Sequence, residues 1–376
     1  MGFDLDQDRV HLNHGAYGAV PRVVREGVVR RAAEAERNPN RYHRVELTGR
    51  IREARARAAS FLHLGGDDVV LVRNVSEATA TVLGSLDLRT GDEVVVTDQN
   101  HRGVRFALDA VARRSGARVV EVPVPLDAGE QRIVAAFAEA VGARTRLVMV
   151  DQITSVTAVL NPVAAVAAAV RQINPEVCVL VDAAHVPAQV DVDPSGLGVD
   201  FWAGNLYKWG FTPRGAGLLW AAEPQRPRLQ PLVASWGADQ PFPVPWEHPG
   251  NQEFGPWLAI PDALDFFDAI GRWERVAASA DLVEAGRAHV AEALGTSDAP
   301  LPPTPAPTMR LVPLPDGVVS SAEDAVALYE RLSVEHRVEA GPACFAGQGF
   351  VRVSGQVYNR SEDYDRLAHA LAAIFR

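Results

Sequence analysis

Lysine is almost absent from this chain of 376 residues. Of the 37 basic residues, 36 are arginine and one, Lys208, is lysine. Arginine supplies a positive charge wherever only charge is needed, but it does not lose its proton in a protein. A desolvated lysine can lose its proton, and its neutral amine can then attack a carbonyl carbon. Lys208 is therefore a candidate Schiff-base nucleophile, although composition alone equally allows a chance survivor on the surface.

Three further scarcities exclude whole classes of protein. Two cysteines, Cys178 and Cys344, cannot build a disulfide framework, which favours a reducing cytoplasm. No apolar run is long enough to span a bilayer, and the first residues lack the apolar core of a signal peptide. The formal net charge of −10, without a basic cluster, argues against a nucleic-acid surface. We expect a cytoplasmic protein that binds neither membrane nor nucleic acid.

Short β-branched runs alternate with helical stretches from about residue 47 to residue 220. This alternation predicts an α/β fold whose parallel strands are buried on both faces. The expected strands are Val69–Val72, Glu93–Val96, Arg118–Val122, Leu147–Asp151 and Val177–Asp182, and the expected helices include Arg105–Ser115, Glu130–Gly142 and Pro162–Ile173.

A second, smaller α/β unit is expected near the carboxyl end. It follows a proline-rich stretch, 224–249, and a long helix, 256–271. Its expected elements are the strands Met309–Val312 and Phe350–Val353 and the helices Ala322–Arg337 and Ser361–Phe375. We therefore expect a large domain of residues 20–260 and a small domain of residues 1–19 and 261–376.

Polar residues gather where the expected strands end, at 74–79, 97–101, 151–155 and 182–185. Ligands of open α/β sheets bind outside the carboxyl ends of the strands, so these corners should meet at one site. Asp182 closes a strand there, and Lys208 follows on a later loop. This pair suits pyridoxal phosphate, because the carboxylate would pair with the pyridinium nitrogen while the lysine carries the aldehyde carbon.

Each of these residues also has an ordinary interpretation. Asp182 alone is more simply a helix cap. The segment 73–78, however, ends a strand and starts a helix, whose N-terminal amides can bind a phosphate. Together with the lone lysine it favours the cofactor. His101 either stacks on the cofactor ring or is only a satisfied polar residue.

The chain resembles the class V aminotransferase family of fold-type I pyridoxal-phosphate enzymes, in particular the isopenicillin N epimerase-like subgroup, which also contains carbon–sulfur lyases. The resemblance covers nearly the whole chain. It rests on the content and order of seven segments, 12–21, 36–39, 72–78, 151–155, 181–185, 204–209 and 351–359. It implies a mostly parallel seven-stranded sheet in the large domain and a homodimer with active sites at the subunit boundary.

The resemblance also implies a role for each matching residue. Lys208 would hold the cofactor and shuttle protons, Asp182 would pair with the pyridine nitrogen, and His101 would stack over the ring. His185 and Gln152 would lie near the phenolic oxygen. The phosphate would be bound by Val75, Ser76, Asn205 and Tyr207, with Asn251 reaching over from the neighbouring subunit. Arg352 and Asn13 would bind the substrate α-carboxylate, and Tyr17 would contribute to the substrate site.

Three of these positions depart from the family pattern. Asn251 stands where the family often has threonine, Tyr207 stands where histidine is common before the lysine, and Gln152 replaces a common histidine. Each replacement can still donate a hydrogen bond.

The reaction stays open at this level. We favour β-elimination from a cysteine S-conjugate with a bulky side chain. The alternatives are decarboxylation with oxidative deamination, epimerisation at Cα and transamination. A cysteine desulfurase is disfavoured, because Cys344 lies only eight residues before Arg352 and Cys178 lies inside an apolar strand. A cofactor-binding protein without turnover is also disfavoured, and so is a metal site, because His11 and His14 have no third ligand nearby.

Overall fold

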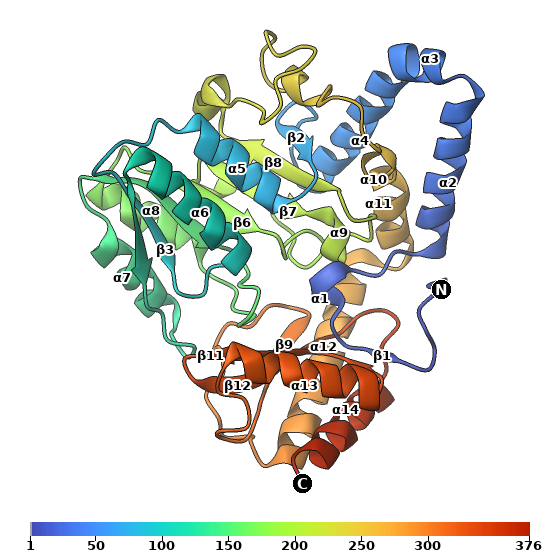
Figure 1. Ribbon diagram of the computed structural model, residues 1–376, viewed down its shortest axis with the longest axis vertical. Coiled ribbons are helices and arrows are strands. Elements are labelled where there is room, and N and C mark those ends of the chain that lie inside the picture. Colours follow the sequence, from blue (N-terminus) through green and yellow to red (C-terminus); the bar gives the residue numbers. More distant parts are fainter. Residues whose placement is uncertain (1) are drawn as a thin grey trace.

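The computed structural model describes residues 2–376 and has a seven-stranded sheet at the centre of its larger part (Figure 1). The strand order is β2-β8-β7-β6-β5-β3-β4. The strands are β2 (Val69–Val72), β3 (Glu93–Thr97), β4 (Arg118–Val122), β5 (Thr145–Asp151), β6 (Cys178–Ala183), β7 (Phe201–Asn205) and β8 (Gly217–Ala221). Only β8 runs antiparallel to its two neighbours. The predicted fold class is confirmed.

Alternate residues of one strand enter different cores, as expected for a sheet covered on both faces. In β6, Val179 and Val181 belong to one hydrophobic cluster, and Cys178 and Leu180 belong to another. The helices of this part are α2 (Arg22–Arg37), α4 (Leu47–Phe61), α5 (Val75–Ser85), α6 (Arg102–Ser115), α7 (Glu130–Ala140), α8 (Val163–Ile173), α9 (Leu206–Trp209), α10 (Gly255–Leu258) and α11 (Ile260–Ala269).

The expected long helix at 256–271 is two helices. α10 ends at Leu258 and α11 begins at Ile260, with Pro261 in its first turn. Proline has no N–H to donate, and in the first turn of a helix none is needed, so a helix can begin there but does not continue smoothly through it. Sequence patterning did not locate the strands β7 and β8.

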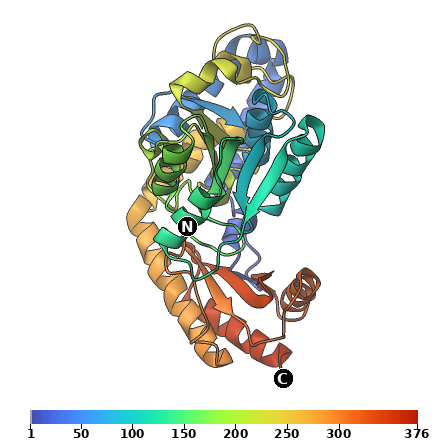
Figure 2. The same ribbon diagram turned by 90° about the vertical axis from the view of Figure 1, so that its left-hand side faces the viewer.

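The smaller part contains the antiparallel sheet β11-β12-β9, formed by Gly341–Phe345, Gln348–Ser354 and Met309–Pro313. Its helices are α12 (Arg272–Leu294), α13 (Ala322–Glu335) and α14 (Ser361–Ile374). The long helix α12 runs along one side of the molecule from the larger part to the smaller (Figure 2). The expected boundaries at residues 19 and 260 stay a prediction.

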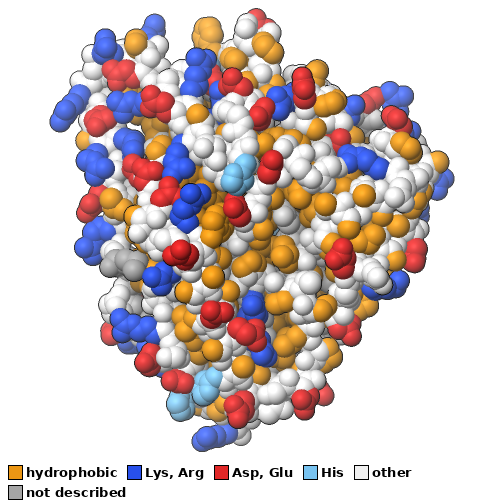
Figure 3. All heavy atoms as spheres, turned by 180° about the vertical axis from the view of Figure 1, so that it is seen from behind, with side chains coloured by type: hydrophobic (Ala, Val, Ile, Leu, Met, Phe, Trp, Pro, Cys, Tyr) orange, Lys and Arg blue, Asp and Glu red, His pale blue; other side chains and the backbone are white. Residues whose placement is uncertain are grey.

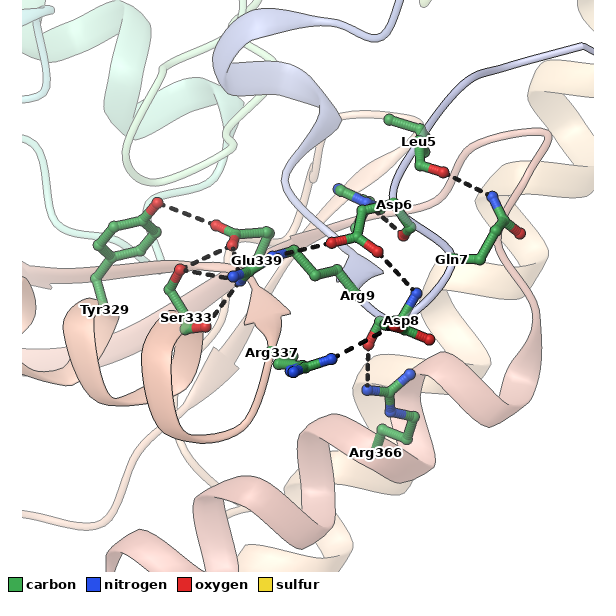
Figure 4. A network of polar contacts seen from close by, with 11 residues as sticks. Leu5, Asp6, Gln7, Asp8, Arg9, Tyr329, Ser333, Arg337, Glu339 and Arg366 are labelled. Atoms are coloured by element: carbon green, nitrogen blue, oxygen red, sulfur yellow. Dashed lines mark hydrogen bonds and ion pairs between the residues drawn. The ribbon is translucent and has the colours of Figure 1, made fainter.

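The N-terminal segment is attached to the smaller part. β1 (Val10–His11) pairs in parallel with β10 (Val338–Glu339). Beside this pair, the Arg9 guanidinium donates to the Glu339 carboxylate at 2.9 Å, and the Tyr329 hydroxyl donates to the same carboxylate at 3.0 Å (Figure 4). The chain then continues directly into α1 (His14–Tyr17), between the two parts (Figure 1).

The surface carries charges of both signs. On the face opposite to Figure 1, acidic and basic side chains are interspersed around hydrophobic ones (Figure 3). Among residues 2–376, no helix combines the length and the apolar character needed to cross a bilayer.

Candidate active site

Four parallel strands deliver the predicted polar residues to one edge of the large sheet. β3, β5, β6 and β7 share a direction, so their carboxyl ends meet. Asp151, Asp182 and Asn205 lie at or next to the ends of β5, β6 and β7, and His101 precedes the first residue of α6. The strand ends converge at this edge, as predicted, because the strands are parallel.

Lys208 lies in the short helix α9 and is only 9% exposed. Its Nζ is 2.8 Å from Nε2 of the buried His185. Desolvation lowers the pKa of Lys208 to about 8, although the Asp182 carboxylate acts in the opposite direction. Desolvation also lowers the pKa of His185 well below its usual value, so the imidazole is neutral. The chain's one lysine is therefore a buried amine that is far easier to deprotonate than a surface lysine.

The His185 ring gives this amine a partner in both protonation states. The indole Nε1 of Trp209 donates to His185 Nδ1 at 3.4 Å, which favours the proton on Nε2 and a hydrogen bond to the neutral amine. A protonated amine would instead donate to Nε2, and the ring proton would move to Nδ1. His185 thus contacts Lys208 directly, a relationship that the spacing of 23 residues did not reveal.

Two buried carboxyl groups lie side by side, because Asp151 and Asp182 are register partners on neighbouring strands. Burial raises the pKa of both groups, and the Asp182 charge raises that of Asp151 further. Lys208 and His101 favour the charged form of Asp182, whereas hydrogen bonds from Asn100 and the His101 amide only partly offset the effect of burial on Asp151. Of the two groups, Asp182 is therefore the one that more readily carries the negative charge.

Asp151 orders the corner that carries His101. Its Oδ2 accepts from Asn100 Nδ2 at 2.7 Å, and its Oδ1 accepts from the His101 backbone amide at 3.4 Å. The His101 side chain itself is exposed, so it is free to lie over a ligand at the sheet edge. Sequence reasoning assigned no role to Asp151 or Asn100. The position of Asp151 at a strand end, shared with Asp182, was the available signal.

Gln152 follows Asp151 and is buried. Its Oε1 accepts from the indole Nε1 of Trp202 at 2.9 Å. Because the indole only donates, this contact fixes the orientation of the amide and leaves the Gln152 Nε2 group as a donor. This amide donor does not titrate. The family that the sequence resembles commonly has a histidine at this position, and a histidine does titrate.

The predicted phosphate end lies at the N-terminus of α5, which Asn74 caps through its side chain. The Val75 amide, expected to bind phosphate, donates instead to Asn205 Oδ1 at 2.9 Å. This contact turns the Asn205 amino group away from Val75, and the Ser76 amide is the next donor of the helix N-terminus. Ser76 is exposed and Tyr207 is partly buried in α9.

The predicted carboxylate anchor is assembled from three distant segments. Arg352 of β12 donates through Nη2 to Asn13 Oδ1 at 2.8 Å and through Nη1 to the Ser155 carbonyl. Desolvation lowers the pKa of Arg352 to about 10, so the guanidinium remains charged at neutral pH. No carboxylate from residues 2–376 pairs with it. It is a desolvated cation that an anionic ligand can match.

The segment containing Asn13 is packed tightly against the lysine helix. Gly18 adopts a φ of +60°, and a Cβ there would lie 2.1 Å from the Tyr207 carbonyl oxygen. A Cβ on Gly15 would meet Trp209 at 2.9 Å. Two glycines of the N-terminal motif thus allow α1 to approach α9 closely, and Asn13 and Lys208 are held by the same contact.

Two further predicted residues are exposed. Tyr17, 73% exposed at the end of α1, lines a cleft together with Asn13 and Arg352, and Asn251 lies in the loop after Gly250. Within the described part of the chain no group of three or more histidine, cysteine or acidic side chains could hold a metal ion.

Comparison with known proteins identifies the family. Residues 20–367 match the aminotransferase class-V family. The chain is 30% identical to an isopenicillin N epimerase from Streptomyces clavuligerus, over 98% of this chain and 96% of that protein. It is also 30% identical to a putative L-cysteine desulfhydrase 2 from Oryza sativa subsp. japonica, over 98% of this chain and 85% of that protein.

Solved structures share the fold over nearly the full length. A complex of the cystine C–S lyase C-DES with cysteine persulfide aligns with a TM-score of 0.80 at 21% identity, covering 97% of this chain and 98% of that one. The cysteine desulfurase CsdA from Escherichia coli aligns with a TM-score of 0.76 at 21% identity, covering 99% and 96%. The sheet order, the buried lysine and the full-length match agree with the resemblance inferred from sequence, and the chain belongs to the aminotransferase class-V family of pyridoxal-phosphate-dependent enzymes.

Proposed function

We propose that this enzyme is a carbon–sulfur lyase that cleaves an S-substituted L-cysteine by β-elimination. The main support for this proposal is the arrangement of two desolvated basic side chains, Lys208 and Arg352. Lys208, with a pKa of about 8, lies beside Asp182 and His185, and Arg352 is fixed by Asn13 without a carboxylate partner. Arg352 can bind the substrate α-carboxylate through its planar fork, while Lys208 accepts the Cα proton.

The reaction balances without an oxidant or reductant. The Cα–H bond and the Cβ–S bond break, the proton passes to the Lys208 amine, and the sulfur leaves as a thiol. The remaining unsaturated amino acid takes up water and gives pyruvate and ammonia. When bound, pyridoxal phosphate supplies the electron sink that makes the Cα proton acidic.

The residues present fit this cofactor. Asp182 is a buried carboxylate whose Oδ1 accepts from the Ala184 amide at 2.9 Å, and a protonated ring nitrogen would compensate its charge. His101 would cover the ring, and the Nε2 group of Gln152 would donate to the phenolic oxygen. Ser76, Asn205 and Tyr207 would hold the phosphate at the start of α5.

The proton path depends on His185. The amine of Lys208 must be neutral to accept a proton, and the neutral His185 ring stabilises that form by donating from Nε2. After the transfer, the ammonium donates back to Nε2. Lys208 is then poised to protonate the departing sulfur, so one side chain serves as base and then as acid.

A desulfurase mechanism requires a cysteine that can approach the substrate sulfur. Cys344 lies in β11, opposite Gly349 of β12, and packs against the core of the smaller part. Cys344 lines the cleft that also borders Arg352 and Asn13, but its place in a paired strand disfavours the excursion of a loop cysteine. Epimerisation is the competing fate, favoured by the 30% identity to the isopenicillin N epimerase. Elimination and epimerisation share the loss of the Cα proton and diverge only after it.

We further propose a homodimer. Asn251 is exposed, and the family resemblance brings its loop to the neighbouring subunit's cofactor. Sedimentation at dilute protein concentration tests the assembly, and a fully active monomer would contradict it.

The test of the lyase is a panel of L-amino acids and S-substituted L-cysteines offered to the holoenzyme. Pyruvate, ammonia and thiol in equal amounts are expected. D-amino acid without pyruvate would show an epimerase, keto acid with retained sulfur a transaminase, and hydrogen peroxide with carbon dioxide an oxidative deaminase. Lys208→Arg, which keeps the charge but not the titratable amine, is the matched negative control.

A further inference from the structure

A cleft of about 740 Å³ is lined by Arg352 and Asn13, and Lys208, Asp182 and His101 are not among its lining residues. It is enclosed by the N-terminal segment with α1, by α13 and by β10 and β11. Its size is within the range of about 300–1,000 Å³ that holds drug-sized ligands. A cysteine side chain would occupy only a small part of it.

Small residues keep this cleft open. Gly341 and Ala343 lie on the face of β11 that carries Arg352, because Gly341 pairs with Arg352 across the strands and residues two apart share a face. On the opposite wall, α13 begins with another small residue, Ala322. Side chains of ordinary size at these positions would fill the space next to the carboxylate anchor.

The lining is apolar and its surface is incompletely covered. Tyr17, Val326, Tyr329 and Val156 line the cleft and are 73%, 59%, 41% and 40% exposed. Covering such side chains is favourable at roughly 25 cal/mol for each Å² removed from water. The cleft thus offers binding free energy to an apolar group and not to a small polar one.

The charges near the cleft are already compensated, apart from Arg352. Glu339 accepts from Arg9, Ser333 and Tyr329, and Figure 4 shows these side chains converging on its carboxylate. Apart from Arg352, which would bind the α-carboxylate, the lining contains no lysine or arginine to pair with an acidic distal group, and burying that charge would be unfavourable.

We propose that this cleft is the subsite for the substituent on the substrate's sulfur, and that it selects uncharged apolar groups of about benzyl size or larger over methyl or hydrogen. This inference rests on the proposed lyase function, because that function places a sulfur atom in the substrate. The existence of the subsite depends only on Arg352 binding the α-carboxylate. With that carboxylate fixed, the side chain of the bound amino acid has the adjacent cleft available to it.

The test compares kcat/KM of the holoenzyme for S-benzyl-, S-(4-carboxybenzyl)- and S-methyl-L-cysteine. Wild type is expected to prefer S-benzyl over both others by about tenfold or more. Val326→Trp narrows the cleft from an exposed position and should reduce the benzyl-to-methyl ratio about tenfold. Val334→Trp, on the same helix, 76% exposed and outside the cleft, is the matched control and should leave the ratio unchanged.

A second variant and a binding measurement distinguish failure of the subsite proposal from failure of the lyase proposal. Ala343→Phe narrows the cleft from β11, and thermal unfolding checks that each variant is folded. The affinity of each amino acid is also read from the change in cofactor absorbance. If no thioether is cleaved but S-benzyl-L-cysteine still binds tighter than S-methyl-L-cysteine, the lyase proposal fails and the subsite stands.

Three results would overturn the subsite. The first is a wild type that binds S-methyl-L-cysteine as tightly as S-benzyl-L-cysteine. The second is an unchanged binding ratio in both folded cleft variants. The third is loss of a wild-type dimer in Val326→Trp, seen by sedimentation, which would assign the cleft to a subunit contact.

Discussion

Arg352 and Asn13 are 339 positions apart in the chain and form a hydrogen bond of 2.8 Å between Nη2 and Oδ1. The bond connects β12 with the N-terminal segment at the point where α1 contacts the lysine helix. It fixes the guanidinium plane before any substrate arrives. Orientation is therefore set by the fold and not by the ligand, which reduces the entropy lost when a carboxylate binds.

Removing this anchor should weaken substrate binding. Arg352→Ala is expected to raise KM by about 30-fold or more, because a desolvated charge pair with the carboxylate is lost. Arg352→Lys should recover little, since a point charge cannot reproduce the fork. Asn13→Ala should have a smaller effect, about fivefold, corresponding to one hydrogen bond. Steady-state kinetics with Arg331→Ala, an exposed arginine of α13, as control distinguish these values from a general charge effect.

The titration of Lys208 should be directly visible, because the chain has one lysine. In apoprotein labelled with ¹³C at the lysine ε-carbon, a single resonance is expected to titrate near pH 8. The direction follows from burial, which disfavours the ammonium, so the neutral fraction grows as pH rises through 8 instead of through the ordinary value of 10.5.

Two further results check this assignment. Asp182→Asn should move the midpoint lower, because the carboxylate favours the charged amine. Borohydride reduction of the holoenzyme should attach the cofactor to Lys208, as found by peptide mapping. A midpoint above pH 10 would show that the amine is exposed in solution.

The two neighbouring carboxyl groups should respond differently to the same substitution. Asp182→Asn removes the charge opposite the ring nitrogen and is expected to reduce kcat by about 100-fold or more while the fold survives. Asp151→Asn leaves the Asp182 carboxylate in place and should keep kcat within a few-fold, with the cofactor absorbance spectrum unchanged. Equal losses in both variants would contradict the assignment of the charge to Asp182.

Cys344→Ala should leave most of the activity, because this thiol packs beside the sheet and takes no part in proton transfer. The measurement is pyruvate release together with mass spectrometry of wild type during turnover. A persulfide trapped on Cys344, with an inactive alanine variant, would identify a desulfurase. Cys178→Ala serves as a control for loss of a buried thiol.

Gly18→Ala should destabilise the protein without touching the chemistry directly. The new Cβ would collide with the Tyr207 carbonyl at a φ of +60°, where side chains other than glycine are strained. We expect a lower thermal midpoint and weaker cofactor retention. Gly84→Ala, whose Cβ would meet no atom within 4 Å, is the control.

The sequence by itself determined the class of fold, the family and the identity of the central nucleophile. Valine-rich runs separated by helical segments specify buried parallel strands, because periodicity and β-propensity act locally. The same pattern located the strand ends and so predicted that Asp182 and His101 lie at one edge of the sheet. Lys208 was identified by its rarity, a property that needs no structure.

Tertiary structure decided what these residues do to one another. The contact of Lys208 with His185, the hydrogen bond of the Val75 amide to Asn205 and the placement of Asp151 beside Asp182 all arise between segments far apart in the chain. Their pKa shifts come from burial, which no local pattern encodes. The cleft beside Arg352 depends on the pairing register of β11 and β12 and on the approach of α13, so its size was decided only by the packed fold.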